Sequence, residues 1–164
     1  MKRLVFLVVV AALCVPAAAL AANPQPNATT LAAHSCKTQQ TQMGATAFNA
    51  LYKTYGACVS KAVRTANGAI QNASATCKAE QAADSTAFAA KYGSAGKSNG
   101  KGSSQSSDAL GACVSSTTQA ANDAKTSALV RGAKACKTER AAGAAAFIAK
   151  YHTFGACVSK QAKS

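Results

Sequence analysis

The sequence predicts an all-α protein of tandem helical hairpins that disulfide bonds staple together. Alanine, the strongest helix former, supplies most of the 49% apolar fraction. A phrase bracketed by two cysteines occurs three times. Beyond residue 22 there are only 20 larger apolar side chains and no Trp, so the core buries little area for each residue. Such a core needs covalent support.

The first residues have the three parts of a secretory signal peptide. A basic pair at 2–3 precedes an apolar run over 4–15 and then a small-residue site. The run is shorter than the roughly 20 residues that span a bilayer. We therefore expect a Sec-type signal peptide at 1–22, cleaved near Ala21 or Ala22, and a secreted or envelope-associated protein. Cleavage removes two cations and lowers the net charge of +13 to +11.

The remaining chain divides into a linker and three copies of one phrase. We expect an N-terminal linker at 23–35, repeat 1 at 36–66, repeat 2 at 67–123 and repeat 3 at 124–164. Repeat 3 contains "CKTERAAGAAAFIAKYHTFGACVSK". Each copy has Cys-Lys, then Ala-Phe, a Tyr four residues after the Phe, and Gly-Ala-Cys-Val-Ser. Repeat 2 also carries a Gly-, Ser- and Lys-rich insertion at 93–107, which is typical of a flexible linker.

Two cysteines in each repeat predict a disulfide framework, because the expected compartment favours oxidation. Six cysteines permit many pairings, and the sequence does not select one. We prefer pairs within each repeat, because a kinked hairpin brings its two ends together. The preferred pairs are Cys36–Cys58, Cys77–Cys113 and Cys136–Cys157. The main alternative joins cysteines of different repeats, for instance Cys36 with Cys77.

The kink comes from a helix-breaking or helix-capping residue four positions before each Phe. Gly44, Asp84 and Gly143 fill this position. We expect a long helix with the first Cys, a kink, a short helix with Phe and Tyr on one face, a tight turn, and a new helix near Gly-Ala-Cys. The repeat core is then formed by Phe48, Tyr52, Phe88, Tyr92, Phe147 and Tyr151.

The segments that connect the repeats predict continuous helices. Apolar residues at 59, 63 and 70 keep helical spacing up to Cys77, and Leu129 precedes Cys136 by the same seven residues. A helix end at Asn67-Gly68 is the alternative.

No catalytic, cofactor or metal site is predicted. The insertion contains Gly-Lys-Ser, but Lys91 stands where a phosphate-binding loop needs its first Gly. No Cys-x-x-Cys is present, and neither His34 nor His152 recurs in register, which argues against zinc.

The few carboxylates do not form a catalytic pattern. Glu80 and Glu139 share one position of the repeat, but Gln39 fills it in repeat 1. This substitution favours a solvated helix face over a catalytic acid.

Lysine is the one residue type that suggests a partner outside the chain. Lys37, Lys78 and Lys137 recur in register, and Lys61 matches Lys160. These residues are candidate contacts for anionic envelope polymers or lipid. With three Arg beyond the signal peptide and no recognition module, specific nucleic-acid binding is not expected. The alternative is that Lys only keeps Ala-rich helices in solution.

Residues 77–93, "CKAEQAADSTAFAAKYG", and 111–116, "GACVSS", resemble repeats in uncharacterised secreted proteins of high-GC Gram-positive bacteria. The resemblance covers nearly all of 36–160, although repeat 1 departs from the pattern at Gln39. It implies export and Cys-paired helical repeats, and it implies no activity.

Three functions fit these observations. The first is a non-enzymatic structural or polyanion-binding protein of the cell envelope. The second is a cationic secreted effector that acts on membranes or inhibits an enzyme. The third, a thiol-based enzyme, requires a reactive free cysteine in the mature chain.

Overall fold

The computed structural model describes residues 26–93 and 105–163, and the side chains of 105–108 are not described. The predicted signal peptide at 1–22 and most of the insertion lie outside these ranges. Within them the chain forms seven helices and no strand, so the all-α prediction is confirmed. The helices are α1 (Ala28–Met43), α2 (Ala45–Tyr52), α3 (Tyr55–Ala83), α4 (Ser85–Tyr92), α5 (Gln105–Ala142), α6 (Ala144–Tyr151) and α7 (Phe154–Gln161).

The ends of two helices differ from the predicted segment boundaries. α1 begins at Ala28, inside the expected linker, because the Asn27 side chain caps it by accepting a hydrogen bond from the backbone N–H of Thr29 at 2.8 Å. α5 begins at Gln105, inside the expected insertion 93–107. The connecting helix α3 runs without interruption through Gly68, so no helix ends there.

Each long helix stops where the kink is predicted. Gly44 separates α1 from α2. Its φ of 82° lies in a region that glycine adopts more readily than other residues. Asp84 lies between α3 and α4, and its carboxylate accepts a hydrogen bond from the backbone N–H of Ala87 at 2.9 Å. Gly143 separates α5 from α6 with an extended backbone. The sequence pattern therefore located all three breaks.

The turns after α2 and α6 share a rare backbone conformation. Lys53 and His152 have φ values of 64° and 59° and ψ values of −51° and −42°. In each turn the following Thr N–H donates to the preceding Tyr carbonyl, at 2.8 Å and 2.6 Å. These are γ-turns with a positive φ at the central residue, the rarer and more strained of the two γ-turn forms. Thr54 and Thr153 then cap α3 and α7.

Disulfides join the two cysteines of each repeat, which is the preferred pairing. They are Cys36–Cys58, Cys77–Cys113 and Cys136–Cys157, each with Cα atoms 6.0 Å apart. The three bridges join α1 to α3, α3 to α5 and α5 to α7, respectively. Three disulfides fit an oxidising compartment.

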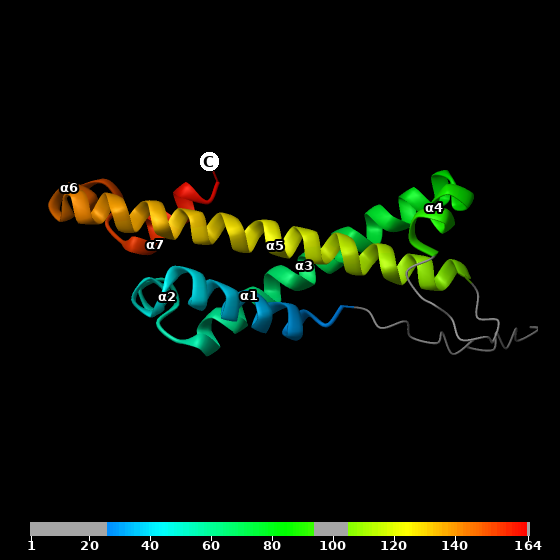
Figure 1. Cartoon of the computed structure of the whole chain (residues 1–164), viewed down its shortest axis with the longest axis horizontal. Helices are drawn as coiled ribbons and strands as arrows, with labels where there is room; N and C mark the ends of the chain where they lie inside the picture. The colour runs from blue at the N-terminus through cyan, green and yellow to red at the C-terminus, as the bar shows by residue number, and fades with distance from the viewer. Residues whose placement is uncertain (1–25, 94–104, 164) are drawn as a thin grey trace, which may run out of the picture.

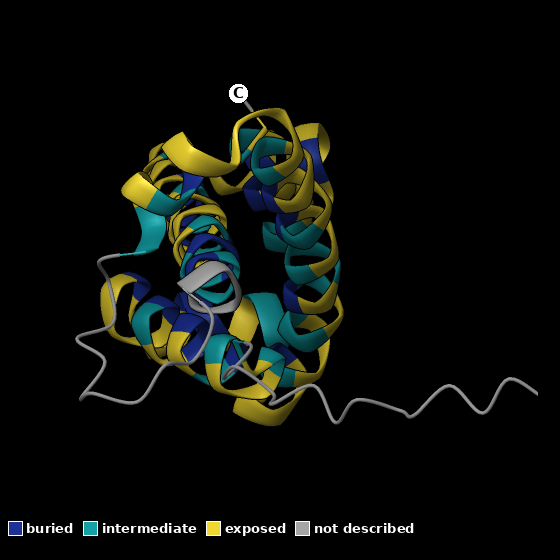
Figure 2. Ribbon diagram, turned by 90° about the vertical axis from the view of Figure 1, so that its right-hand side faces the viewer, coloured by how far each residue is buried: buried dark blue, intermediate teal, exposed yellow. Residues whose placement is uncertain are grey.

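The three repeats do not stack in sequence order (Figure 1). The long helices α3 and α5 run in opposite directions, with α1, α2, α6 and α7 at one end and α4 at the other. Repeats 1 and 3 consequently share one core cluster, which includes Phe48, Phe147 and Val158. Repeat 2 has a separate, smaller cluster around Phe88. In the end-on view, buried residues lie on the inner sides of the helices and exposed residues on the outer sides (Figure 2).

The predicted aromatic residues of each repeat lie beside its disulfide. The ring centroids of Phe and the following Tyr are 5.1 Å, 4.9 Å and 5.1 Å apart in the three repeats. Phe48, Phe88 and Phe147 are buried, and so is Tyr151, whereas Tyr52 and Tyr92 are half-buried.

Candidate functional site

The lysines that recur in the sequence lie on four different helices. Lys37 is on α1, Lys61 and Lys78 are on α3, Lys137 is on α5 and Lys160 is on α7, and all five are exposed. Three of them directly follow a buried cysteine, so the helix turns them outward while the cysteine faces the core. Their positions follow from the internal repeat.

The acidic position of repeats 2 and 3 is part of a small network across the kink. Glu80 accepts a hydrogen bond from Lys91 at 2.7 Å and one from the Tyr92 hydroxyl at 3.3 Å. Glu139 likewise accepts from the lysine and tyrosine of α6, at 2.6 Å and 3.0 Å. Both carboxylates keep about a third of their side chain exposed, as a solvated helix face predicts, and they also tie the short helix to the long one, which the sequence did not indicate.

Both networks lower the pKa of their carboxylate and so favour its charged form. The hydrogen bond from Lys91 is the main cause that holds the pKa of Glu80 below its ordinary value. The hydrogen bond from Lys150 does the same to the pKa of Glu139. Both groups are thus charged and paired at neutral pH, which is unlike the poised pKa of a general acid.

Repeat 1 replaces both charged members of this network. Gln39 stands in the position of the glutamates, and Leu51 stands in the position of Lys91 and Lys150. The tyrosine is kept, and the Tyr52 hydroxyl donates to Gln39 Oε1 at 2.7 Å. Burial raises the pKa of Tyr52. The kink of repeat 1 is therefore closed by a neutral hydrogen bond.

Gln39 continues the hydrogen bonding into the core. It is only 2% exposed, and its Nε2 donates to Ser35 Oγ at 3.0 Å. Ser35 Oγ lies 2.6 Å from Thr126 Oγ1 of α5, and both residues are buried. The chain from Tyr52 to Thr126 thus links α2, α1 and α5 with satisfied polar groups.

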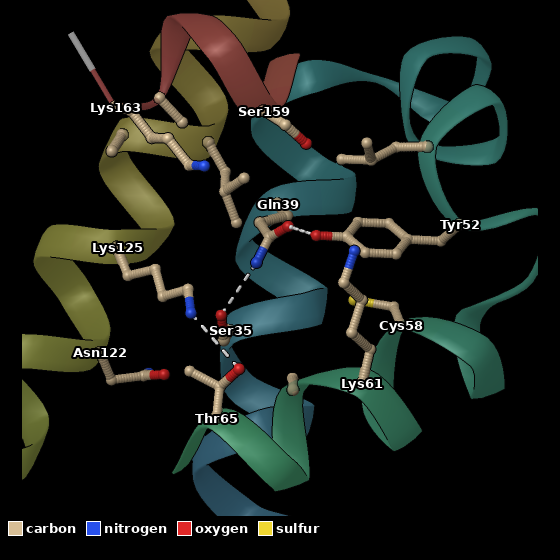
Figure 3. A pocket seen from close by; sticks show the side chains of 15 residues that line it. Ser35, Gln39, Tyr52, Cys58, Lys61, Thr65, Asn122, Lys125, Ser159 and Lys163 are labelled. Carbon is tan, nitrogen blue, oxygen red and sulfur yellow. Dashed lines mark hydrogen bonds between the residues drawn. The ribbon is translucent and has the colours of Figure 1, made fainter. Parts of the chain in front are cut away.

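A cavity of about 300 Å³ lies beside this chain (Figure 3). α1 packs against α3 and α5, and α5 packs against α7, so the cavity lies where repeat 1 meets repeat 3. Ser35, Gln39 and Tyr52 line one part of it, and Cys58 of the first disulfide is also at its wall. The apolar lining consists of Leu51, Ala62, Ala128, Leu129 and Ala162.

Three lysines from three segments line the same cavity, and no carboxylate among the described residues does. Lys61 comes from α3, Lys125 from α5, and Lys163 follows the end of α7. Lys61 Nζ lies 5.9 Å from the centre of the Tyr52 ring, and Lys125 Nζ donates to Thr65 Oγ1 at 3.3 Å. Asp123 is adjacent to this wall in sequence but is not part of the lining. The cavity therefore combines positive charge with an apolar surface.

The sequence predicted only part of this site. Lys61 was a candidate contact, Tyr52 a core residue and Leu129 part of the predicted helical spacing, but Lys125 and Lys163 carried no signal. One sequence feature could have indicated the site. In repeat 1, uncharged residues replace both the Glu and the Lys that repeats 2 and 3 share.

Neither family models, curated proteins nor solved structures provide a match to this chain. The resemblance to secreted Cys-repeat proteins stays a prediction. Among the described residues, no group of His, Cys, Asp and Glu is arranged to hold a metal ion. No helix in the same part of the chain has both the length and the hydropathy needed to cross a bilayer.

Proposed function

We propose that this is a secreted, non-catalytic, disulfide-stapled protein that binds anionic polymers or lipid at the cell envelope. One observation carries the proposal. Every Lys and Arg side chain in 26–93 and 109–163 is exposed, and among the side chains of these ranges only Lys91 and Lys150 form an ion pair with a carboxylate. The rest of the positive charge faces solvent, where it attracts polyanions.

The remaining features are consistent with a binding role. All six cysteines of repeats 1 to 3 are bonded to one another, so none of them supplies a thiolate nucleophile. The paired carboxylates have lowered pKa values. The predicted signal peptide and the three disulfides support a location outside the cytosol.

Retention on isolated cell walls tests the proposal. We expect the protein to be retained at low salt and released as salt increases, because screening shortens the reach of surface charges to roughly 10 Å at 0.1 M. A variant with Lys37→Gln, Lys78→Gln and Lys137→Gln is expected to elute at lower salt.

The matched control is Glu80→Gln with Lys91→Gln, which removes one ion pair and leaves the net charge unchanged. This control should elute like the wild type. Absence of retention at low salt, or identical elution of the triple variant and the wild type, would contradict the proposal.

Leakage of anionic liposomes separates the alternative, a cationic effector. A membrane-active protein would release dye at a protein concentration at which an envelope-binding protein only coats the vesicles. Leakage that disappears in vesicles of neutral lipid would favour the effector.

A further inference from the structure

We propose that the cavity between repeats 1 and 3 binds a small amphipathic anion, an organic acid with an apolar body. This inference goes beyond envelope binding, because it concerns one partly open pocket with a mixed lining and not the charge of the whole surface. Size, charge and a comparison among the three repeats support it.

The size of the cavity sets the size of the ligand. A water molecule occupies about 30 Å³ in the liquid, so about 300 Å³ accommodates roughly ten non-hydrogen atoms. This volume lies at the lower end of the range for ligand pockets in proteins. A medium-length organic acid matches this volume.

The lining sets the chemistry of the ligand. Lys61, Lys125 and Lys163 approach from three different segments, and in the described part of the chain no carboxylate of the lining neutralises them. The apolar side chains of Leu51 and Leu129 lie in the same cavity. An acid group near the ammonium groups and a hydrocarbon body against the leucines would satisfy both parts of the lining. A small inorganic anion would leave the apolar part in contact with water.

The comparison among the repeats indicates why the site is in repeat 1. Repeats 2 and 3 hold a Glu–Lys ion pair at the corresponding positions. Replacing only one partner would leave an unpaired charge, but repeat 1 has both Gln39 and Leu51. The exchange removes the carboxylate that would compete with an anionic ligand and adds an apolar wall. Tyr52 stays in place because Gln39 still accepts its hydrogen bond.

The test uses octanoate as the probe, because its size matches the cavity. The disulfide-bonded protein is titrated below the concentration at which the probe aggregates, and binding is followed by calorimetry and by amide chemical shifts. We expect saturable binding at one site, with shifts concentrated at α1, α3, the middle of α5 and the end of α7. Octanol, octylammonium and acetate should each bind at least about tenfold more weakly, since each lacks the charge or the body that the lining requires.

Two pairs of variants locate the site. Gln39→Glu with Leu51→Lys installs the ion pair of the other repeats, and we expect it to weaken octanoate binding at least about tenfold. The reverse exchange, Glu139→Gln with Lys150→Leu, changes repeat 3 and should leave binding unchanged.

The second pair consists of surface changes that keep the fold. Lys125→Gln should weaken binding severalfold, whereas Lys134→Gln, on the same helix but outside the cavity, should not. Equal binding by octanoate and octanol, unsaturable binding, or undiminished affinity in both the Gln39/Leu51 and Lys125 variants would overturn the proposal. Cell-wall retention is measured separately, so the two proposals can fail independently.

Discussion

Removal of the Cys77–Cys113 disulfide provides the sharpest test of how this protein is stabilised. The bridge joins residues 36 positions apart, the widest separation of the three. For a loop of this length, the chain-entropy model gives a stabilisation of about 4 kcal/mol. Whole domains are stable by about 5–15 kcal/mol, so the bridge supplies a large share of the total.

The expected loss is concentrated at one end of the molecule. Cys77 and Cys113 are buried beside Phe88 in the smaller core cluster, which is separate from the core that repeats 1 and 3 share. The variant Cys77→Ala with Cys113→Ala should therefore release α4 and the adjoining ends of α3 and α5 first. The other end keeps its two disulfides and its larger core.

Urea unfolding followed by circular dichroism measures the magnitude. With a slope of about 2 kcal/mol per molar urea, the midpoint should fall by about 2 M. Hydrogen exchange should show early loss of protection in α4 and retained protection in α1 and α7. A loss below about 1 kcal/mol, or uniform loss of protection along the chain, would refute this reasoning.

Three smaller predictions concern single positions. Gly68→Ala should stabilise α3 by about 1 kcal/mol, because no described atom lies near the added Cβ. Gly132→Ala should not stabilise the protein, because its Cβ would lie 3.0 Å from a carbonyl oxygen of α7. Thermal unfolding of the two variants and the wild type tests this difference. Lys53→Gly should gain about 1 kcal/mol by relieving a positive φ, as measured by urea unfolding. Glu139→Gln should flatten the acid side of the pH–stability curve. The pKa of Glu139 is lower in the folded protein than the ordinary value of 4.5, so the ionised side chain stabilises the fold at pH values above 4.5. This contribution is lost as the pH falls through the pKa of the folded state.

The local features of the fold were predictable because each depends on neighbouring residues. The breaks at Gly44, Asp84 and Gly143 follow from glycine conformation and side-chain capping. A kink at these points brings the two cysteines of a repeat together, which is why the preferred pairing agrees with the disulfides found. The continuity of α3 through Gly68 follows from its apolar spacing, which outweighs the cost of one glycine.

The packing of repeat 1 against repeat 3 was not predictable in the same way. It depends on α3 and α5 running alongside each other in opposite directions, and no short sequence pattern specifies that register. Gly132 is a partial signal, since α7 approaches it closely, but a glycine within a helix does not by itself identify the segment that packs against it. The cavity shares this origin, because Lys61 and Lys125 are far apart in the sequence.

The disulfides connect the stability of the fold to the proposed ligand site. Cys58 of the Cys36–Cys58 bridge lines the cavity, and the Cys136–Cys157 bridge joins α5 to α7, which both contribute to its lining. An Ala-rich core has few large side chains to hold helices apart, and without crosslinks these helices would be free to close over the space. With both hairpins held covalently, a ligand does not have to order the walls as it binds, and that cost is not subtracted from its affinity. The same bonds that compensate for a sparse core therefore keep a cationic cavity open between repeats 1 and 3.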